Sequence, residues 1–261
     1  MLGVPRSDRP LDPGLASTAK GPAWVRETWR VTGHAGDRVP VDAYVAEGEI
    51  SVVVLAAHGF TGSRRARYLT GASKAWTREG LAVVALDLPF HGDRAVPGAD
   101  PTAIHATDAV VRSLGDLGRV VDLVEGHDRL RGRPIGLLGF SMGGWLGTLF
   151  AAGDRRVAGL CLCVVGSNAR RVRFSGPPLT DDQEAALLAA DPATYAAAVG
   201  DRPVLMLNAD RDEIFDRVSA LDLYDAFEPP KSLTFFPGTH AEWPEPGPVY
   251  AAMQRFLADL G

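Results

Sequence analysis

The stretch Pro134–Ala152 reads PIGLLGFSMGGWLGTLFAA and sets one serine among glycines between two apolar runs. The first run has the length and composition of a buried strand, and the second has those of a buried helix. Gly139 and Gly143 flank Ser141 with the spacing G-x-S-x-G, which between a strand and a helix is typical of a sharp turn that exposes a serine hydroxyl. Side chains at the two glycine positions would collide in such a turn. Because backbone N–H groups at the helix N-terminus can stabilise an oxyanion, the pattern predicts a nucleophile at Ser141. The plainer alternative is an ordinary strand–helix turn in which the serine caps the helix.

Short apolar runs recur on both sides of this stretch, and helical patterns separate them. Nearly continuous apolar runs are typical of parallel strands that are covered on both faces. The runs are residues 51–58, 81–88, 134–140, 157–165 and 203–209. Two earlier segments, residues 24–32 and 39–47, alternate polar and apolar residues, which predicts antiparallel strands with one wet face. The sequence therefore predicts an α/β fold with a mostly parallel central sheet, an antiparallel N-terminal edge and helices on both faces.

The domain organisation follows from the segments that do not fit this alternation. Residues 1–23 contain scattered Pro and Gly and are predicted to form a flexible N-terminal arm. Residues 24–261 are predicted to form one domain. Within it, residues 167–201 are too long for a plain connection, so we expect a small lid insertion there.

A serine hydroxyl needs a base, and the base needs a group that orients it. Of the six histidines, His240 comes just past the last predicted strand, in the stretch LTFFPGTHAEW (residues 233–243), at the carboxyl end of the sheet where Ser141 also lies. The orienting acid is expected in the loop after residues 203–209. Asp212 lies in the middle of that loop and is preferred, with Asp210 as the alternative; Asp216 is expected to cap the next helix.

Other candidate site residues surround this set. The backbone N–H groups of Phe60 and Met142 are expected to form the oxyanion hole, with His58 and Gly59 shaping the loop. Candidate substrate-binding residues are Trp145, Phe174, Leu179 and Trp243. Two groups of arginines could attract an anionic substrate, although a solvated basic edge is the more common arrangement. These groups are Arg64, Arg65 and Arg67, and Arg170, Arg171 and Arg173.

The composition argues against several classes of partner. The formal net charge is -5, so the chain is not expected to bind a nucleic-acid backbone. No stretch approaches the roughly 18 apolar residues that a membrane span needs, and no membrane partner is expected. No secretory signal is visible, and a cytoplasmic location is predicted. Cys161 and Cys163 are expected to be buried small hydrophobic residues, and no metal site or cofactor is predicted.

Four motifs resemble those of α/β-hydrolases of the serine esterase, dienelactone-hydrolase-like and acyl-aminoacyl-peptidase-like group. They are HGFTGS, GFSMGG, PVLMLNADRDEIF and GTH, and the resemblance covers about Trp24 to Gly261. It implies hydrolysis of an ester, thioester or amide without a cofactor, and the order Ser141, Asp212, His240 matches the order of the triad in this fold. Dienelactone hydrolases carry a cysteine where Ser141 stands, so their substrate is not implied.

The leading hypothesis is a serine hydrolase that cleaves a small carboxylic ester through an acyl-enzyme. A thioesterase, or an acyltransferase or cyclase of a biosynthetic pathway, would use the same residues. A binding module that keeps the fold without turnover would be expected to have lost part of the triad.

Overall fold

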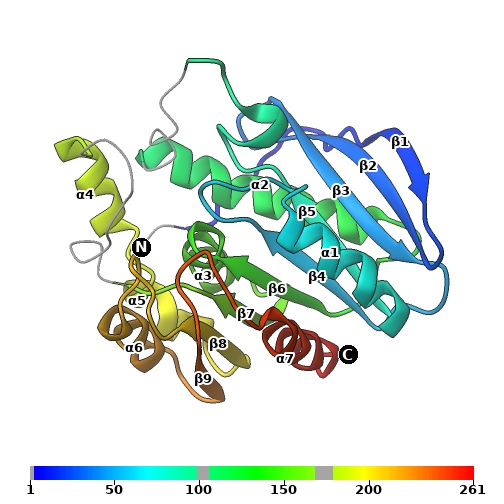
Figure 1. Ribbon diagram of the computed structural model, residues 1–261. Coiled ribbons are helices and arrows are strands. Elements are labelled where there is room, and N and C mark those ends of the chain that lie inside the picture. The colour runs from blue at the N-terminus through cyan, green and yellow to red at the C-terminus, as the bar shows by residue number, and fades with distance from the viewer. Residues whose placement is uncertain (1–2, 99–105, 168–178) are drawn as a thin grey trace.

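A computed structural model describes residues 3–98, 106–167 and 179–261. Strands and short helices alternate along these residues (Figure 1). The strands are β1 (Gly14–Lys20), β2 (Trp24–Thr32), β3 (Arg38–Ala46), β4 (Val52–Ala57), β5 (Leu81–Leu86), β6 (Ile135–Phe140), β7 (Val157–Cys163), β8 (Val204–Ala209) and β9 (Lys231–Phe236). The α-helices are α1 (Arg67–Trp76), α2 (Thr107–Gly126), α3 (Met142–Gly153), α4 (Asp181–Ala189), α5 (Ala193–Ala196), α6 (Arg217–Ala226) and α7 (Pro246–Ala258).

The strands form one sheet in the order β1-β2-β3-β5-β4-β6-β7-β8-β9. The pairs from β1 to β3, and β3 with β5, are antiparallel, whereas every pair from β5 through β4 to β9 is parallel. This is the predicted mixed sheet with an antiparallel N-terminal edge. Parallel neighbours need crossover helices, so the carboxyl ends of β4 to β9 and the loops that follow them gather at one edge.

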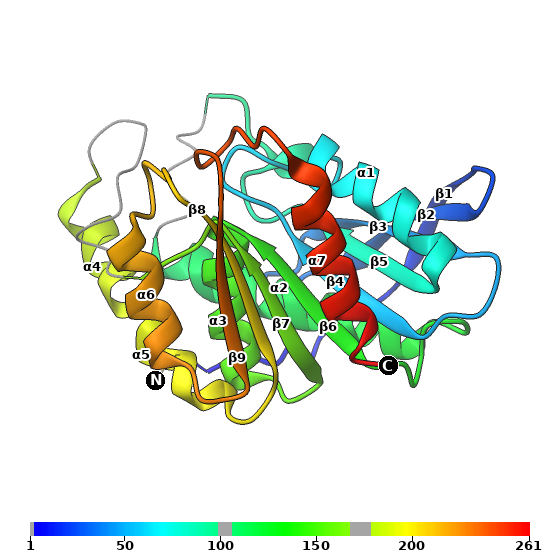
Figure 2. The same ribbon diagram turned by 60° about the horizontal axis from the view of Figure 1, so that its bottom comes forward.

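The helices cover both faces of the sheet, as predicted (Figures 1 and 2). On one face α1 and α7 bury Leu69, Trp76, Met253 and Leu257 against alternate residues of the central strands. On the other face α2, α3 and α6 pack against the remaining alternate residues. Each central strand is therefore buried on both sides, which explains why the parallel strands are continuous apolar runs. No helix in the described ranges is long and apolar enough to cross a membrane.

The first 23 residues differ from the expected flexible arm wherever the structure describes them. Gly14–Lys20 form an edge strand that pairs with β2, and Thr32 N donates to Leu11 O at 2.8 Å. Val4 packs against the core, where Gly118 and Gly153 leave room for it. Pro and Gly content was a poor guide here, because strand pairing uses backbone groups and small Ala, Ser and Thr side chains suit an edge.

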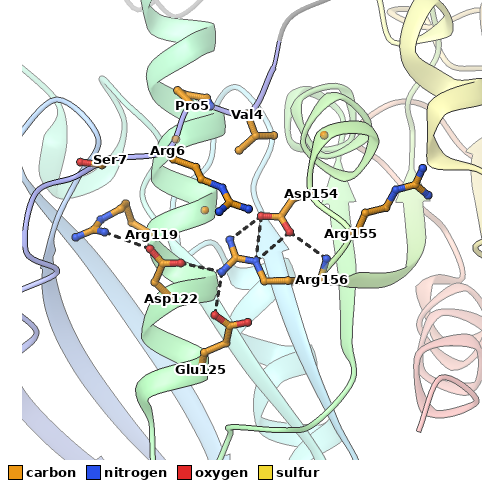
Figure 3. A pocket seen from close by; sticks show the side chains of 13 residues that line it. Val4, Pro5, Arg6, Ser7, Arg119, Asp122, Glu125, Asp154, Arg155 and Arg156 are labelled. Carbon is orange, nitrogen blue, oxygen red and sulfur yellow. Dashed lines mark hydrogen bonds and ion pairs between the residues drawn. The ribbon is translucent and has the colours of Figure 1, made fainter.

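The N-terminal segment also closes a cleft of about 550 Å³ against α2 and the turn after α3 (Figure 3). Figure 3 shows Arg156 at its centre, with Nη1 2.8 Å from Asp122 and 3.0 Å from Glu125, and Nη2 2.6 Å from Asp154. Burial alone would raise the pKa of Asp154, but the hydrogen bonds and charge of Arg156 outweigh it, and the pKa is lowered. Arg119 donates to the backbone oxygens of Thr32 and Arg9 at 3.0 and 2.9 Å, and so ties the N-terminal segment to the sheet.

Candidate active site

Ser141 occupies the turn between β6 and α3 in a backbone conformation that L residues rarely adopt. Its φ is 50° and its ψ is -116°. Such a conformation costs on the order of 1–3 kcal/mol and persists only where the surroundings hold it. The surroundings do so on both sides: Ser141 N donates to Cys163 O of β7 at 2.9 Å, and Ser141 O accepts from Gly144 N and Trp145 N in the first turn of α3.

The two glycines of the motif are required by backbone that lies next to them. A Cβ on Gly139 would lie 2.5 Å from Gly144 Cα and 2.7 Å from Gly143 O. A Cβ on Gly143 would lie 2.7 Å from His58 O and still closer to the Ala57 carbonyl at the end of β4. The collision predicted from the motif is therefore present at both positions. At Gly143 it is with the neighbouring strand, which draws the loop after β4 against the turn.

His240 reaches this serine from the loop after β9. Its Nε2 lies 2.9 Å from Ser141 Oγ, and its Nδ1 lies 2.9 and 3.0 Å from the two carboxylate oxygens of Asp212. Because an ionised carboxylate only accepts hydrogen bonds, we assign the proton to Nδ1, which leaves Nε2 to accept the serine hydroxyl proton. The Asp212 side chain is 1% exposed and that of His240 is 13% exposed. Ser141, His240 and Asp212 thus form one hydrogen-bonded line.

The loop after β8 contains the two acids between which the sequence left a choice. Asp212 Oδ1 accepts from Ile214 N at 2.9 Å and Phe215 N at 2.8 Å, so the carboxylate that faces His240 is held from behind. Asp210 is instead 44% exposed and accepts from Gly238 N at 3.0 Å. Asp210 therefore braces the loop that carries His240 and does not contact the imidazole. Asp216 accepts from Ser219 N at 2.8 Å and caps α6, as expected.

Glu213 belongs to the same arrangement, and the sequence assigned no role to it. Its Oε2 accepts from the backbone N–H of His240 at 3.1 Å. A carboxylate in a loop rich in acids has no pattern that singles it out. Only the approach of the β8 and β9 loops brings it to His240.

The loop after β4 carries Phe60 next to the serine. A Cβ on Gly59 would be 3.5 Å from Ser141 Cβ, and Met142 is the first residue of α3. His58 is fully buried; its Nδ1 lies 2.8 Å from Gly59 O, and its Nε2 accepts from Leu88 N at 3.1 Å. Burial lowers the pKa of His58 to about 3, so the ring is neutral and joins this loop to the one after β5.

The sequence matches the model of the alpha/beta hydrolase family over residues 52–259, which include every one of these loops. The chain belongs to the alpha/beta hydrolase family. No curated protein matches the sequence.

Solved structures of this hydrolase fold resemble the chain over nearly its whole length. A PEG-bound, cold-adapted esterase from an Arctic intertidal metagenomic library is 23% identical with a TM-score of 0.74, covering 94% of this chain and 97% of that one. An acetyl xylan esterase from Paenibacillus sp. R4 is 20% identical with a TM-score of 0.78, covering 96% and 89%. Acetyl xylan esterase 1 from Thermoanaerobacterium sp. JW/SL YS485 is 17% identical with a TM-score of 0.77, covering 97% and 89%. At these identities the likeness establishes the fold.

Two of the three arginines after the loop that carries Phe60 are paired with carboxylates of the protein. Arg64 is 2% exposed, pairs with the buried Asp87, and lies 2.7 Å from Asp93 and 3.4 Å from Asp42. Arg65 donates to Asp42 at 2.8 Å. Arg64 is therefore neutralised inside the protein, and Arg65, whose side chain is 44% exposed, is paired with the buried Asp42. Of the three, only Arg67 has an exposed side chain without a carboxylate partner in the described residues. The second group, Arg170, Arg171 and Arg173, lies outside the described residues.

Of the candidate substrate-binding residues of the hydrolase, the two tryptophans pack against residues next to the site. Trp145 is 6% exposed and packs on Phe215, whose ring centroid is 5.9 Å from that of His240. Trp243 stacks on Phe140 at 6.3 Å and meets Phe236 at 5.0 Å. Leu179 is half-buried against the core. Phe174 lies outside the described residues. Trp243 therefore supports Phe140, the residue before Ser141, and Trp145 supports Phe215, which lies beside His240.

Neither cysteine side chain takes part in this site. Cys161 and Cys163 are fully buried in β7, and burial raises the pKa of both thiols, so both remain protonated. Within the described ranges, no group of three or more His, Cys, Asp or Glu side chains could hold a metal ion.

Proposed function

We propose that this alpha/beta hydrolase is a serine esterase that cleaves small carboxylic esters through an acyl-enzyme. The observation that carries the proposal is the hydrogen-bonded line from Ser141 Oγ through His240 to Asp212, with 2.9 Å at each end. Nucleophile, base and orienting carboxylate within hydrogen-bond distance are the arrangement that activates a serine hydroxyl.

In the acylation step, Ser141 Oγ attacks the carbonyl carbon of the ester while its proton passes to His240 Nε2. Asp212 holds the ring through Nδ1–H and stabilises the imidazolium that forms. The carbonyl oxygen becomes an oxyanion, for which we propose the backbone N–H groups of Phe60 and Met142 as donors. Collapse of the intermediate expels the alcohol, which takes its proton from Nε2, and leaves the acyl group on Oγ.

In the deacylation step, water gives a proton to His240 Nε2 and attacks the acyl carbon, and the serine hydroxyl is restored as the acid leaves. Both steps need four groups from separate loops to lie close together: Ser141, Asp212, His240 and the Phe60 N–H. The esterases whose folds resemble this chain support an ester as the substrate class.

We further propose that the insertion at residues 167–201 acts as a lid on the domain of residues 24–261. The insertion begins directly after β7, whose carboxyl end lies at the edge of the sheet where the loops of the site gather, and its described part contains α4 and α5. A segment there can select the acyl or leaving group without taking part in the chemistry. Leu179 and Phe174 are the proposed contacts.

The test is a panel of chromogenic esters of increasing acyl length, with a matching thioester and with an alcohol as a competing acceptor. A fluorophosphonate probe reports in parallel on Ser141. We expect turnover of short esters and stoichiometric labelling that is absent in Ser141→Ala. Preferred thioester cleavage or acyl transfer to the alcohol would replace the esterase by the corresponding activity. A folded protein that neither turns over nor is labelled would exclude a serine hydrolase.

A further inference from the structure

Both polar backbone groups of Gly59, the residue before Phe60, are held by hydrogen bonds. Its carbonyl oxygen accepts from Gly62 N at 2.9 Å and lies 2.8 Å from His58 Nδ1. Its N–H donates to the hydroxyl of Tyr68 at 2.9 Å. Glycine is the residue whose backbone turns most freely, so these bonds take the place of the restraint that a side chain would supply.

The direction of the Phe60 N–H depends on these bonds. In a planar trans peptide, the C=O of Gly59 and the N–H of Phe60 point in opposite directions. Holding the Gly59 oxygen toward His58 and Gly62 therefore holds the Phe60 N–H away from them. The Tyr68 bond fixes the preceding peptide plane, so the two planes on either side of Gly59 are both set.

Tyr68 is placed for this task by α1 and by the serine turn. It lies in the first turn of α1, and its ring centroid is 4.9 Å from that of Phe140, the residue before Ser141. The hydroxyl fits closely: a Cβ on Gly62 would overlap it. Burial raises the pKa of Tyr68 to about 12, so the hydroxyl stays neutral at physiological pH. Tyr68 thus touches the oxyanion loop with its hydroxyl and the serine turn with its ring.

We propose that Tyr68 is a positioning residue that aligns the Phe60 N–H with the oxyanion through its hydrogen bond to Gly59. The proposal rests on the serine-esterase function and deepens it. Oxyanion donors act on charge that develops in the transition state, so misaligning one lowers kcat more than it changes KM. Losing a whole donor costs on the order of 10²–10³ in kcat, and a donor that is only loosened costs less, about 10-fold.

The experiment compares Tyr68→Phe with Tyr224→Phe. Tyr224 is a matched control because its hydroxyl lies 3.5 Å from Lys231 O, at the opposite end of the sheet. For Tyr68→Phe we expect kcat about 10-fold lower, KM within about twofold of wild type, and a similar loss of affinity for an alkyl boronic acid, which forms a tetrahedral anion on serine. Tyr224→Phe should leave all three at wild-type values.

A second variant makes the test independent of the folding of the first. Gly62→Ala places a methyl group against the Tyr68 hydroxyl and should give the same selective loss of kcat. Once Tyr68→Phe has removed the hydroxyl, the overlap is gone and the methyl group keeps only its tight contacts with Gly59 O at 3.1 Å and His58 Cβ at 3.2 Å, so the double variant should lose little more than Tyr68→Phe alone. Additive losses would overturn the proposal.

Two failures remain distinguishable. A wild-type protein without turnover or boronate binding would overturn the esterase function and this inference with it. An active wild type together with a Tyr68→Phe variant that keeps its kcat and boronate affinity would overturn the inference alone. A Tyr68→Phe variant that loses melting temperature without a selective fall in kcat would also overturn it, since that is the effect of a merely structural residue.

Discussion

Two polar clusters lie at opposite ends of α3 and are organised in different ways. At its N-terminus the hydrogen bonds run in a line from Asp212 through His240 to Ser141 Oγ, and the line ends on a group that can react. At its C-terminus three carboxylates converge on Arg156, and the cluster closes on itself (Figure 3). Both clusters contain charged side chains, one beside the Ser141 turn and the other in the Figure 3 cleft. Charge alone therefore does not distinguish a candidate active site from a cluster that only stabilises the fold.

The difference lies in what each cluster leaves available. In the Figure 3 cleft, no described lining residue has a buried side-chain polar atom without a partner. The charges of Arg156 and its three carboxylates satisfy one another, and Arg119 of α2 holds the N-terminal segment through Arg9 O. At the other end, backbone strain at Ser141 presents a hydroxyl whose proton faces a neutral nitrogen. Reactivity follows from a strained, directional arrangement, and stability follows from a closed one.

The strongest test of this contrast is Ser141→Ala. Removing the Ser141 hydroxyl, which ends the hydrogen-bonded line, should lower kcat for esters on the order of 10⁵–10⁶-fold, because triad members act as a unit. The melting temperature should change little, since Ala fits the same space and only the part-buried hydrogen bond between Ser141 Oγ and His240 Nε2 is lost. Steady-state kinetics and thermal unfolding measure both. Turnover near that of wild type would contradict the serine mechanism.

The middle of the line is tested by Asp212→Asn, with Asp210→Asn as the matched control in the same loop. An amide at position 212 cannot accept from Nδ1–H with both oxygens and favours the wrong ring tautomer, so a loss of about 10⁴-fold in kcat is expected. Asp210→Asn keeps an oxygen that can accept from Gly238 N and should lose no more than a few-fold. If the two variants ranked in the reverse order, the orienting role would pass to Asp210.

The closed cluster should respond in stability and not in rate. Arg156→Met leaves three carboxylates facing one another, and because the guanidinium is 33% exposed the expected loss is about 1–2 kcal/mol of unfolding free energy. The values of kcat and KM should not change. Arg131→Met is the control, since Arg131 is 66% exposed and lies 3.9 Å from Asp128. A selective loss of activity in Arg156→Met would show that the two ends of α3 are coupled.

The smallest expected effect is a dependence of stability on pH that belongs to the site end alone. The pKa of His58 falls from 6.5 to about 3 on folding, so the folded state resists protonation that the unfolded state accepts. Its contribution is fully present above pH 6.5 and is lost progressively as the pH falls toward 3.

Arginine does not titrate in this range, and the pKa of Asp154 in the Arg156 cluster is lowered from 3.8, so the cluster contributes little slope above about pH 5. Denaturant unfolding at several pH values should therefore show stability that decreases on acidification in wild type. The decrease should be shallower in His58→Gln, whatever the absolute stability of that variant. An identical slope in the two proteins would remove His58 as the cause.

The sequence by itself determined the fold class and the position of Ser141 in the turn between β6 and α3. Eight of the strands and the main crossover helices follow from periodicity, because a strand buried on both faces admits little but apolar residues. The spacing G-x-S-x-G carries a steric requirement that is local in the chain at Gly139, where a side chain would collide with Gly143 and Gly144 in the first turn of α3. Asp212 and His240 were found because the ends of parallel strands meet at one edge.

Only the tertiary structure decided which polar groups meet across loops that are far apart in the chain. Nothing local separates Asp212 from Asp210, or an arginine at a solvated edge from Arg64 in its buried cluster of carboxylates. Tyr68 and Glu213 have no motif, and their partners are backbone groups, which every residue possesses. The strand at Gly14–Lys20 was missed for the same reason: its stability comes from the exposed backbone of β2, and a partner edge exists only once the rest of the sheet has formed.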